Sequence, residues 1–242
     1  MYIKALFGLF VCCTLLSATE GQVVITDVAP TEFPHIVKIQ FNEQLTVQTS
    51  TGIFVSARYV FSSFPPGMPR TKDSFTVTDQ LGTVLPVVKY EGSGILHYLK
   101  FCEKFKGTPL NLSLSSFDSW ATNVSAQMMF FNTTSNTLKK VSVTLLDNST
   151  CSTITPFDFA DVICMASDVT TDFCKETHKD STSDPPYKMY SLVAIGSQIN
   201  GVLASGQCTG GNLTSDRPYF FHLKLSSYRQ DIIDLVPKVD IV

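Results

Sequence analysis

The sequence predicts an all-β fold of the barrel or sandwich type. Four apolar or alternating runs of strand length occur in its second half, at 141–146, 161–166, 190–196 and 219–225. Clusters of Ser, Thr, Asn, Asp, Pro and Gly separate these runs, as turns separate short strands. The length of 242 residues suits one domain of this kind, or two small ones, once a leader is removed.

Residues 1–21 have the composition of a secretory signal peptide. Lys4 supplies the positive charge, and the apolar run at 5–16 is too short to span a bilayer as a helix. Cleavage after Ala18 or after Gly21 would leave small residues at the boundary. An N-terminal membrane anchor is the alternative. We expect a secreted, extracellular chain at 22–242.

Charge and composition argue against several functional classes. The formal net charge is −3, and no basic run along the chain predicts binding to nucleic acid or to a membrane. There is no glycine-rich phosphate loop, so we expect no cofactor. The four histidines lack metal-ligand spacing, so we expect no metal site either; they are His35, His97, His178 and His222.

Five cysteines remain once Cys12 and Cys13 leave with the leader: Cys102, Cys151, Cys164, Cys174 and Cys208. An oxidising compartment favours their pairing, and the last four allow three connectivities. Cys102 is left over. It is either buried and inert, or it bridges to another chain and forms a disulfide dimer.

Asparagines in N-x-S/T sequons predict a glycosylated surface, because most of them fall in expected turns. They are Asn111, Asn123, Asn132, Asn148 and Asn212.

The order of segments in the second half resembles that of chymotrypsin-like (S1) serine proteases. A strand with Val141 and Val143 precedes Cys151, Cys164 follows in VICMA, and Cys174 opens the stretch TDFCKE. The run LVAIGS (192–197) precedes Cys208, and a strand beginning at Pro218 and a helical pattern, SSYRQDIIDLV, close the chain.

The resemblance implies two six-stranded antiparallel β-barrels and a C-terminal helix. It places the first barrel at about 22–118, the second at about 119–225 and the helix at about 226–236. It also implies the disulfides Cys151–Cys164 and Cys174–Cys208.

The first half of the chain also resembles this family, but other residues replace the catalytic histidine and two cysteines. The stretch STGIFVSARYVFSSFPPG (50–67) is similar to the family pattern CGGSLISxRxVLTAAHC. In this register Ser50 replaces the first cysteine, Pro66 replaces the last, and Pro65 replaces the catalytic histidine. Proline has no ring nitrogen that could accept a proton, so general-base catalysis is lost at this position. The segment 23–41 resembles a mature protease N-terminus without its IVGG motif or a preceding basic residue, so we expect no zymogen activation.

The other triad positions are also altered. Gly94 stands where the aspartate is expected, and we interpret nearby His97 as an ordinary, half-exposed strand residue. The nucleophile position falls on His178, or on Ser181 if three residues are inserted, and Thr182 and Ser183 then replace the glycines of the oxyanion hole.

Two residues match the specificity pocket only as relics. Asp172 corresponds to the aspartate that binds a basic side chain, and Tyr219 replaces a pocket-lining glycine and would fill the pocket. Segments 178–186 and 198–208 are expected to be loops that border the substrate cleft.

The sequence therefore predicts a secreted, catalytically inactive serine protease homologue, of a kind common in insects. We expect it to act by binding an extracellular protein, such as an active protease or its substrate, as a cofactor, a decoy or a component of an extracellular fluid. One alternative is an active S1-type endopeptidase with a displaced triad. The other is a structural or carrier glycoprotein that retained only the fold.

Overall fold

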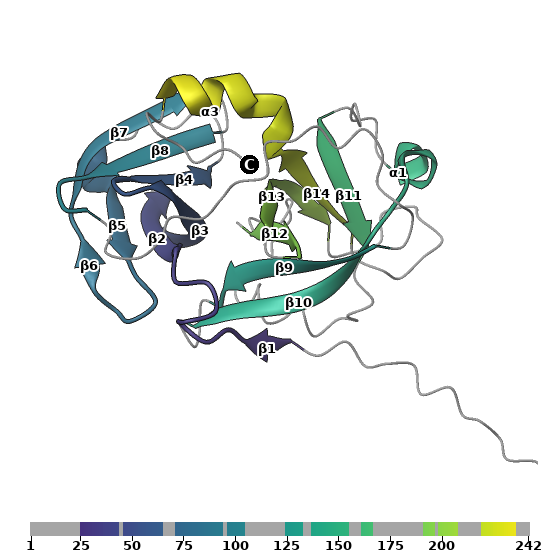
Figure 1. The fold of residues 1–242 in the computed structure, drawn as a ribbon, viewed down its shortest axis with the longest axis horizontal. Helices are drawn as coiled ribbons and strands as arrows, with labels where there is room; N and C mark the ends of the chain where they lie inside the picture. The colour runs from purple at the N-terminus through teal and green to yellow at the C-terminus, as the bar shows by residue number, and fades with distance from the viewer. Residues whose placement is uncertain are drawn as a thin grey trace, which may run out of the picture.

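The computed structural model describes residues 25–43, 46–64, 71–93, 96–104, 124–132, 137–154, 161–166, 191–196, 198–207 and 219–235. These residues form two antiparallel sheets, each rolled into a barrel, and a short helix near the C-terminus (Figure 1). The predicted all-β fold with two barrels and a C-terminal helix is confirmed.

The first barrel consists of strands from residues 36–101, in the order β6-β5-β2-β3-β4-β8-β7. Their bounds are β2 (Ile36–Glu43), β3 (Thr46–Ser56), β4 (Tyr59–Ser63), β5 (Phe75–Thr78), β6 (Val84–Leu85), β7 (Val87–Ser93) and β8 (Leu96–Phe101), with a 3-10 turn η1 (Lys72–Ser74) before β5. Alternate side chains point inward. The buried interior includes Val37, Ile39, Phe41, Phe54, Val60, Phe64, Val77 and Leu99.

Pro86 explains why this barrel has seven described strands where six were expected. It lies between β6 and β7, and a proline donates no amide hydrogen to a ladder. The strand is therefore interrupted: β6 pairs with β5, and β7 pairs with β8 at the other end of the strand order. Residues 84–93 thus connect the two ends of a nearly closed barrel.

The second barrel is closed, because β9 pairs with both β10 and β12. Its ring runs β9-β10-β11-β14-β13-β12. The bounds are β9 (Ser125–Phe131), β10 (Leu138–Leu145), β11 (Val162–Ala166), β12 (Leu192–Ile195), β13 (Gln198–Gln207) and β14 (Tyr219–Lys224), and helix α1 (Asn148–Ile154) follows β10. Its interior is filled by Ala126, Met128, Phe130, Val141, Val143, Ile163, Met165, Val193 and Phe220.

The N-terminal strand β1 (Thr26–Asp27) pairs with β10 of the second barrel rather than with the first. The sequence-based boundary, which places residues from about 22 onward in the first barrel, stays a prediction, and this pairing concerns Thr26 and Asp27 alone. The Asp27 carboxylate lies 2.9 Å from Lys139 Nζ and accepts a hydrogen bond from Thr137 at 3.0 Å. These contacts, the Lys139 bond first, lower the pKa of Asp27, so the carboxylate that holds the segment in place stays ionised.

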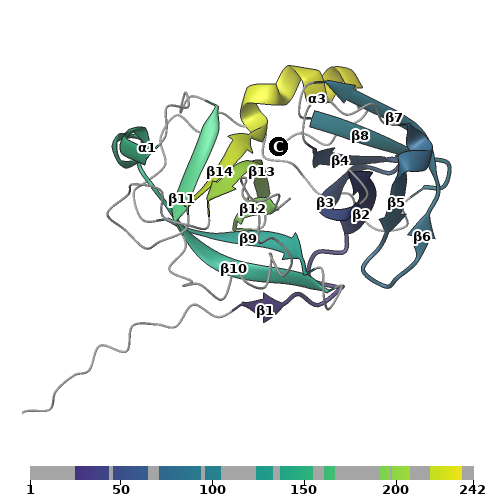
Figure 2. The same cartoon turned by 180° about the vertical axis from the view of Figure 1, so that it is seen from behind.

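A single apolar cluster joins the two barrels and the C-terminal helix. It includes Ile53, Phe61 and Tyr98 of the first barrel, Met129, Leu192 and Val202 of the second, and Ile232 of α3. A 3-10 turn, η2 (Leu225–Tyr228), leads from β14 into α3 (Arg229–Leu235). Both views show α3 over the β7–β8 side of the first barrel, although α3 follows β14 of the second barrel along the chain (Figures 1 and 2). No helix in the described part of the chain is long and apolar enough to cross a membrane.

The segment expected to be a loop at 198–208 is instead mostly strand β13, which lies between β12 and β14. This strand was not predicted because its glycines and polar residues interrupt the alternation of apolar and polar side chains. Gly201 has a packing role, because a Cβ atom there would lie 2.9 Å from the carbonyl oxygen of Leu223 and 3.0 Å from Val193 Cγ1.

Candidate functional site

The positions that match the catalytic triad lie outside the described residues: Pro65, Gly94, His178 and Ser181. The same holds for Asp172, Cys174, Cys208 and the side chain of Tyr219. Their assignments remain sequence-based predictions. The structure does describe the residues that precede and follow several of these positions.

Strands β4 and β8 bring the segments leading to Pro65 and from Gly94 to the same end of the first barrel. Ser63, near the end of β4, is the register partner of Leu96, at the start of β8. Phe64 follows Ser63 and is buried in the barrel interior, where its ring centroid lies 5.0 Å from that of Phe41 and 5.1 Å from that of His97. Aromatic rings therefore fill the barrel next to these two positions.

His97 is buried, with 7% of its surface exposed, which corrects the expectation of a half-exposed ring. Its Nδ1 atom lies 2.7 Å from the Tyr90 hydroxyl oxygen, and the two rings are nearly parallel. Gly92 leaves room for this pair, because a Cβ atom at that position would lie 2.3 Å from His97 Nδ1. The pair is a packed element of the barrel core.

Ser50, at the position of the first family cysteine, takes part in a chain of buried hydroxyls. Its Oγ atom lies 2.9 Å from Ser62 Oγ, and Ser62 donates to the carbonyl oxygen of Thr51 at 3.1 Å. All three residues are buried. Hydrogen bonds across strands β3 and β4 thus connect the strands at a position where the resemblance implies a disulfide.

The second barrel contains a serine and a histidine within hydrogen-bond distance. Ser191 Oγ and His222 Nε2 are 3.1 Å apart. His222 is completely buried, and burial lowers its pKa to about 3. No described carboxylate contacts its Nδ1 atom. A working nucleophile needs substrate access and an oriented base, so this pair is structural.

Sequence reasoning missed the Ser191–His222 pair, since the two residues match no motif. One signal was available. In the run YFFHLKL, alternation places His222 on the same face as Phe220, which is the interior of the barrel.

No group of three or more metal-ligating side chains occurs within the described ranges. His35 is also buried, and burial lowers its pKa to about 4. Its ring packs edge-on against Phe33, with the centroids 6.0 Å apart. We interpret it as a neutral core residue.

Segments 192–195 and 198–207 form two neighbouring strands of the second barrel, β12 and β13. The resemblance matched LVAIGS (192–197) to the strand before Cys208, but β12 and β13 are two separate strands here. Gln207 of β13 is the register partner of Tyr219 on β14. The end of β13 at 205–207 therefore lies beside β14.

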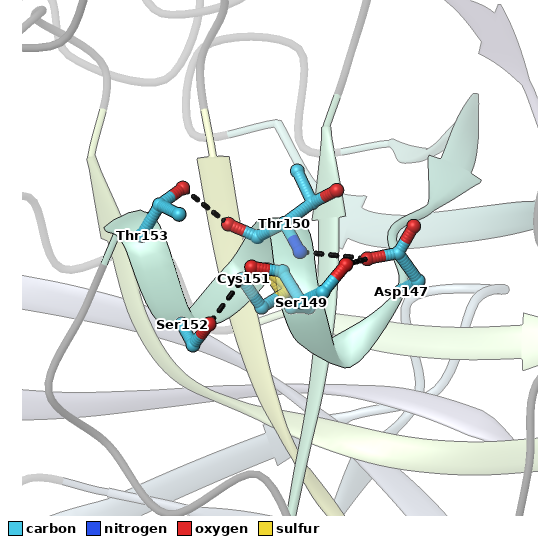
Figure 3. Close-up of a disulfide and its surroundings, with 7 residues drawn as sticks. Asp147, Ser149, Thr150, Cys151, Ser152 and Thr153 are labelled. Carbon is cyan, nitrogen blue, oxygen red and sulfur yellow. Dashed lines mark hydrogen bonds between the residues drawn. A yellow bond between two sulfur atoms is a disulfide. The ribbon is translucent and has the colours of Figure 1, made fainter.

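The disulfide Cys151–Cys164 is present and joins α1 to β11 (Figure 3). Asp147 caps the helix, since its carboxylate accepts hydrogen bonds from Ser149 Oγ and from the Thr150 amide, both at 2.6 Å. These bonds lower the pKa of Asp147, that from Ser149 most. Cys102 is free and exposed. Exposure removes the buried alternative for Cys102 and leaves the bridge to another chain as a prediction.

Two of the five sequon asparagines fall within the described ranges. Asn148 is exposed at the start of α1, as a glycan acceptor must be. Asn132 is 7% exposed, so its burial argues against glycosylation in the folded chain. Asn111, Asn123 and Asn212 lie outside the described residues.

No protein-family model and no curated protein matches the sequence. Solved structures do match the fold. The scabies mite inactivated protease paralogue S-I1 aligns with a TM-score of 0.65 and 14% identity, over 87% of this chain and 97% of that one. Kallikrein-related peptidase 10 aligns with a TM-score of 0.60 and 15% identity, over 86% and 98% of the two chains.

A third match is the Vibrio cholerae VesB protease, with a TM-score of 0.63 and 15% identity, over 86% of this chain and 66% of that one. The fold is trypsin-like. At these identities the likeness concerns the fold alone, and the matched structures include both proteases and inactivated paralogues. The trypsin-like fold therefore does not decide whether the chain is active.

Proposed function

We propose that the chain is a secreted, catalytically inactive serine protease homologue that acts by binding another extracellular protein. The observation that carries the proposal is Pro65, which the sequence resemblance aligns with the general base of a trypsin-like protease.

The nucleophile segment supports the loss of activity independently of Pro65. If the nucleophile position is Ser181, Thr182 and Ser183 follow in place of glycines, and if it is His178, Lys179 and Asp180 follow instead. Those glycines let backbone amides point at the oxyanion, an electrostatic contribution that is often the largest in acyl transfer. Losing the base and the oxyanion hole together would remove several powers of ten in rate.

Secretion is supported by the leader at 1–21 and by the disulfide Cys151–Cys164, since disulfides persist in oxidising compartments. Binding of a protein partner is supported by a complete two-barrel scaffold, on which loops are held in fixed positions. Two segments, 178–186 and 198–208, were expected to be loops that border the substrate cleft. Because 198–207 forms strand β13, we propose 178–186 as the region that contacts the partner.

Activity is tested with a serine-directed fluorophosphonate probe on the purified secreted chain, with trypsin as the positive control. We expect no labelling and no hydrolysis of peptides with basic residues. A Ser181→Ala variant is the matched control. Labelling or turnover by the wild-type chain that disappears in this variant would establish the alternative, an active endopeptidase.

Binding is tested by chemical cross-linking of the chain in the extracellular fluid where it occurs, followed by mass spectrometry. We expect one protein, a protease or a protease substrate, to be cross-linked through 178–186. Scrambling this segment should abolish the cross-link, whereas Asn148→Gln on exposed α1 should leave it unchanged. A wild-type yield from the scrambled chain would place the interface elsewhere.

A further inference from the structure

Basic side chains from three segments of the chain meet on the outer surface of the first barrel, near the end of β8. Lys100 on β8 is the register partner of Lys89 on β7 and of Tyr59 on β4. The amide that follows Lys100 donates to the carbonyl oxygen of Arg58 at 2.9 Å, so Arg58 lies beside the same strand end. Lys104 follows β8 and is exposed. We call Arg58, Tyr59, Lys89, Lys100 and Lys104 the cationic face.

The pairing of Lys89 with Lys100 is unfavourable for the isolated chain. Register partners on adjacent antiparallel strands project from the same face with Cβ atoms about 5 Å apart, and like charges in this arrangement are destabilising. The two ammonium groups turn to different neighbours. Lys89 pairs with Glu91, and Lys100 Nζ lies 5.5 Å from the centroid of the Tyr59 ring. A local arrangement that costs stability is often found where a ligand is bound.

Each of the two ammonium groups has a partner of its own. The hydrogen bond to Glu91 raises the pKa of Lys89, and the face of an aromatic ring attracts a cation such as Lys100. Arg58 and Lys104 are exposed, and no salt bridge holds either of them within the part of the chain that the structure describes.

Carboxylates near the cationic face do not cancel its charge. Glu91 and Glu103 lie on the same strands or just beyond them, against four basic side chains. Asp231 of α3 contributes to the raised pKa of Tyr98 on β8, after the larger effect of burial. The face keeps an excess of positive charge on a chain whose formal net charge is −3.

We propose that the cationic face binds a sulfated glycan, a linear polyanion found on cell surfaces and in the extracellular matrix. The inference rests on the proposed secretion, because a secreted chain meets such glycans. Sulfate groups stay ionised and repeat along the polymer, which suits a group of cations on β7, on and after β8, and just before β4.

The cationic face is not visible along the sequence, which contains no basic run. Arg58, Lys89 and Lys100 are far apart in the chain, and only the pairing of β4 with β8 and of β8 with β7 aligns them. The expectation that nucleic acid and membranes are not partners is unaffected by this proposal.

The probe for the test is heparin, immobilised on a column at neutral pH and low salt. We expect the secreted chain to be retained and to elute with added salt, and not to be retained on desulfated heparin. The variant Lys89→Gln/Lys100→Gln should bind on the order of tenfold more weakly, with a salt slope smaller by about two, because each lost contact releases about one counterion fewer. Asp231→Asn should strengthen retention.

The matched control is Lys139→Gln/Lys140→Gln, which removes the same charge on β10, where Asp27 and Glu32 already pair with these lysines. We expect its retention to equal that of the wild type. Equal weakening of both variants would reduce the effect to net charge and overturn the proposal. So would a wild-type chain that passes through the column, or tighter binding to phosphatidylserine vesicles or to duplex DNA than to heparin.

The heparin experiment uses the purified chain and does not depend on catalysis. Retention together with fluorophosphonate labelling would reject the inactive-homologue proposal and keep the glycan site. No retention together with no labelling would do the reverse.

Discussion

The Nε2 atom of His222 lies 3.1 Å from the hydroxyl oxygen of Ser191, in the interior of the second barrel. Ser191 directly precedes β12, and His222 belongs to β14, so the contact reaches across the intervening strand β13. Ser191 is the first described residue after the segment that contains His178 and Ser181, so this hydrogen bond anchors the start of β12 in the barrel core.

We expect Ser191→Ala to lower the free energy of unfolding by about 1–3 kcal/mol, because it leaves a buried ring nitrogen of His222 without its partner. Urea denaturation of the two proteins measures the difference. Ser142→Ala is the control, since Ser142 is exposed on β10 and its loss should change stability by no more than about 0.5 kcal/mol. Equal effects of the two substitutions would show that the Ser191 hydrogen bond is not stabilising.

Gly92→Ala should destabilise the first barrel. The added methyl group would lie 2.3 Å from His97 Nδ1 and 2.9 Å from the Tyr90 hydroxyl, so the ring pair would have to move. Overpacking of this kind costs about 1–3 kcal/mol, measurable by urea denaturation. In a double-mutant cycle with His97→Ala, most of the cost should disappear, because the smaller side chain leaves space. A cost that persists without the ring would assign the role of Gly92 to the backbone.

The fold could be predicted from the sequence because its signals are local. Short alternating runs such as 141–146 mark strands, and the spacing of Cys151 and Cys164 marks the second barrel. The strand β13 was missed because Gly201, Asn200 and Gln198 break its alternation. Asn200 has a structural reason to be there: its side-chain oxygen accepts a hydrogen bond from the Ile195 amide at 2.9 Å, at an irregularity between β12 and β13.

The candidate site was less predictable than the fold. The exposure of His97 depends on ring packing against Tyr90, on the adjacent strand, and against Phe64, which is 33 positions away in the sequence. Likewise, Lys89 and Lys100 become neighbours only through strand register. What a residue lacks, such as a basic nitrogen at Pro65, can be read directly from the sequence. The packing around a residue in the folded chain cannot be read from the sequence in this way.

Stability should fall as the pH decreases below about 6.5, the value at which an unfolded histidine titrates. Burial lowers the pKa of His35 to about 4 and that of His222 to about 3. Between these values the unfolded chain binds protons that the folded chain does not. The free energy of unfolding is therefore highest above this window and falls by about 1.4 kcal/mol per pH unit for each histidine.

Urea denaturation at pH 7, 6 and 5 would measure this slope, which is positive with pH. In His222→Gln the amide can still bond to Ser191 but does not titrate, so the slope should be about half as steep. Restricting the range to pH 5 and above keeps Asp27 and Asp147 ionised, since their pKa values are lowered. An unchanged slope in the variant would mean that His222 is protonated in the folded chain as readily as in the unfolded one.

Removing the disulfide by Cys151→Ala/Cys164→Ala should lower the free energy of unfolding by about 3 kcal/mol, as expected for a closed loop of this size. The two cysteines are 13 positions apart and buried, so part of the loss comes from packing. The single variant Cys151→Ala also removes the disulfide but leaves the Cys164 thiol in the core. Comparing it with the double variant separates the loss of the covalent bond from the loss of packing at Cys164. Because the disulfide anchors α1 to β11, its removal should increase hydrogen exchange in α1 more than in the strands of the first barrel.

Peptide mapping without reduction should also recover Cys174 linked to Cys208. A peptide that links Cys174 to the exposed Cys102 instead would contradict the resemblance on which that second bridge, and the position of the nucleophile segment, depend.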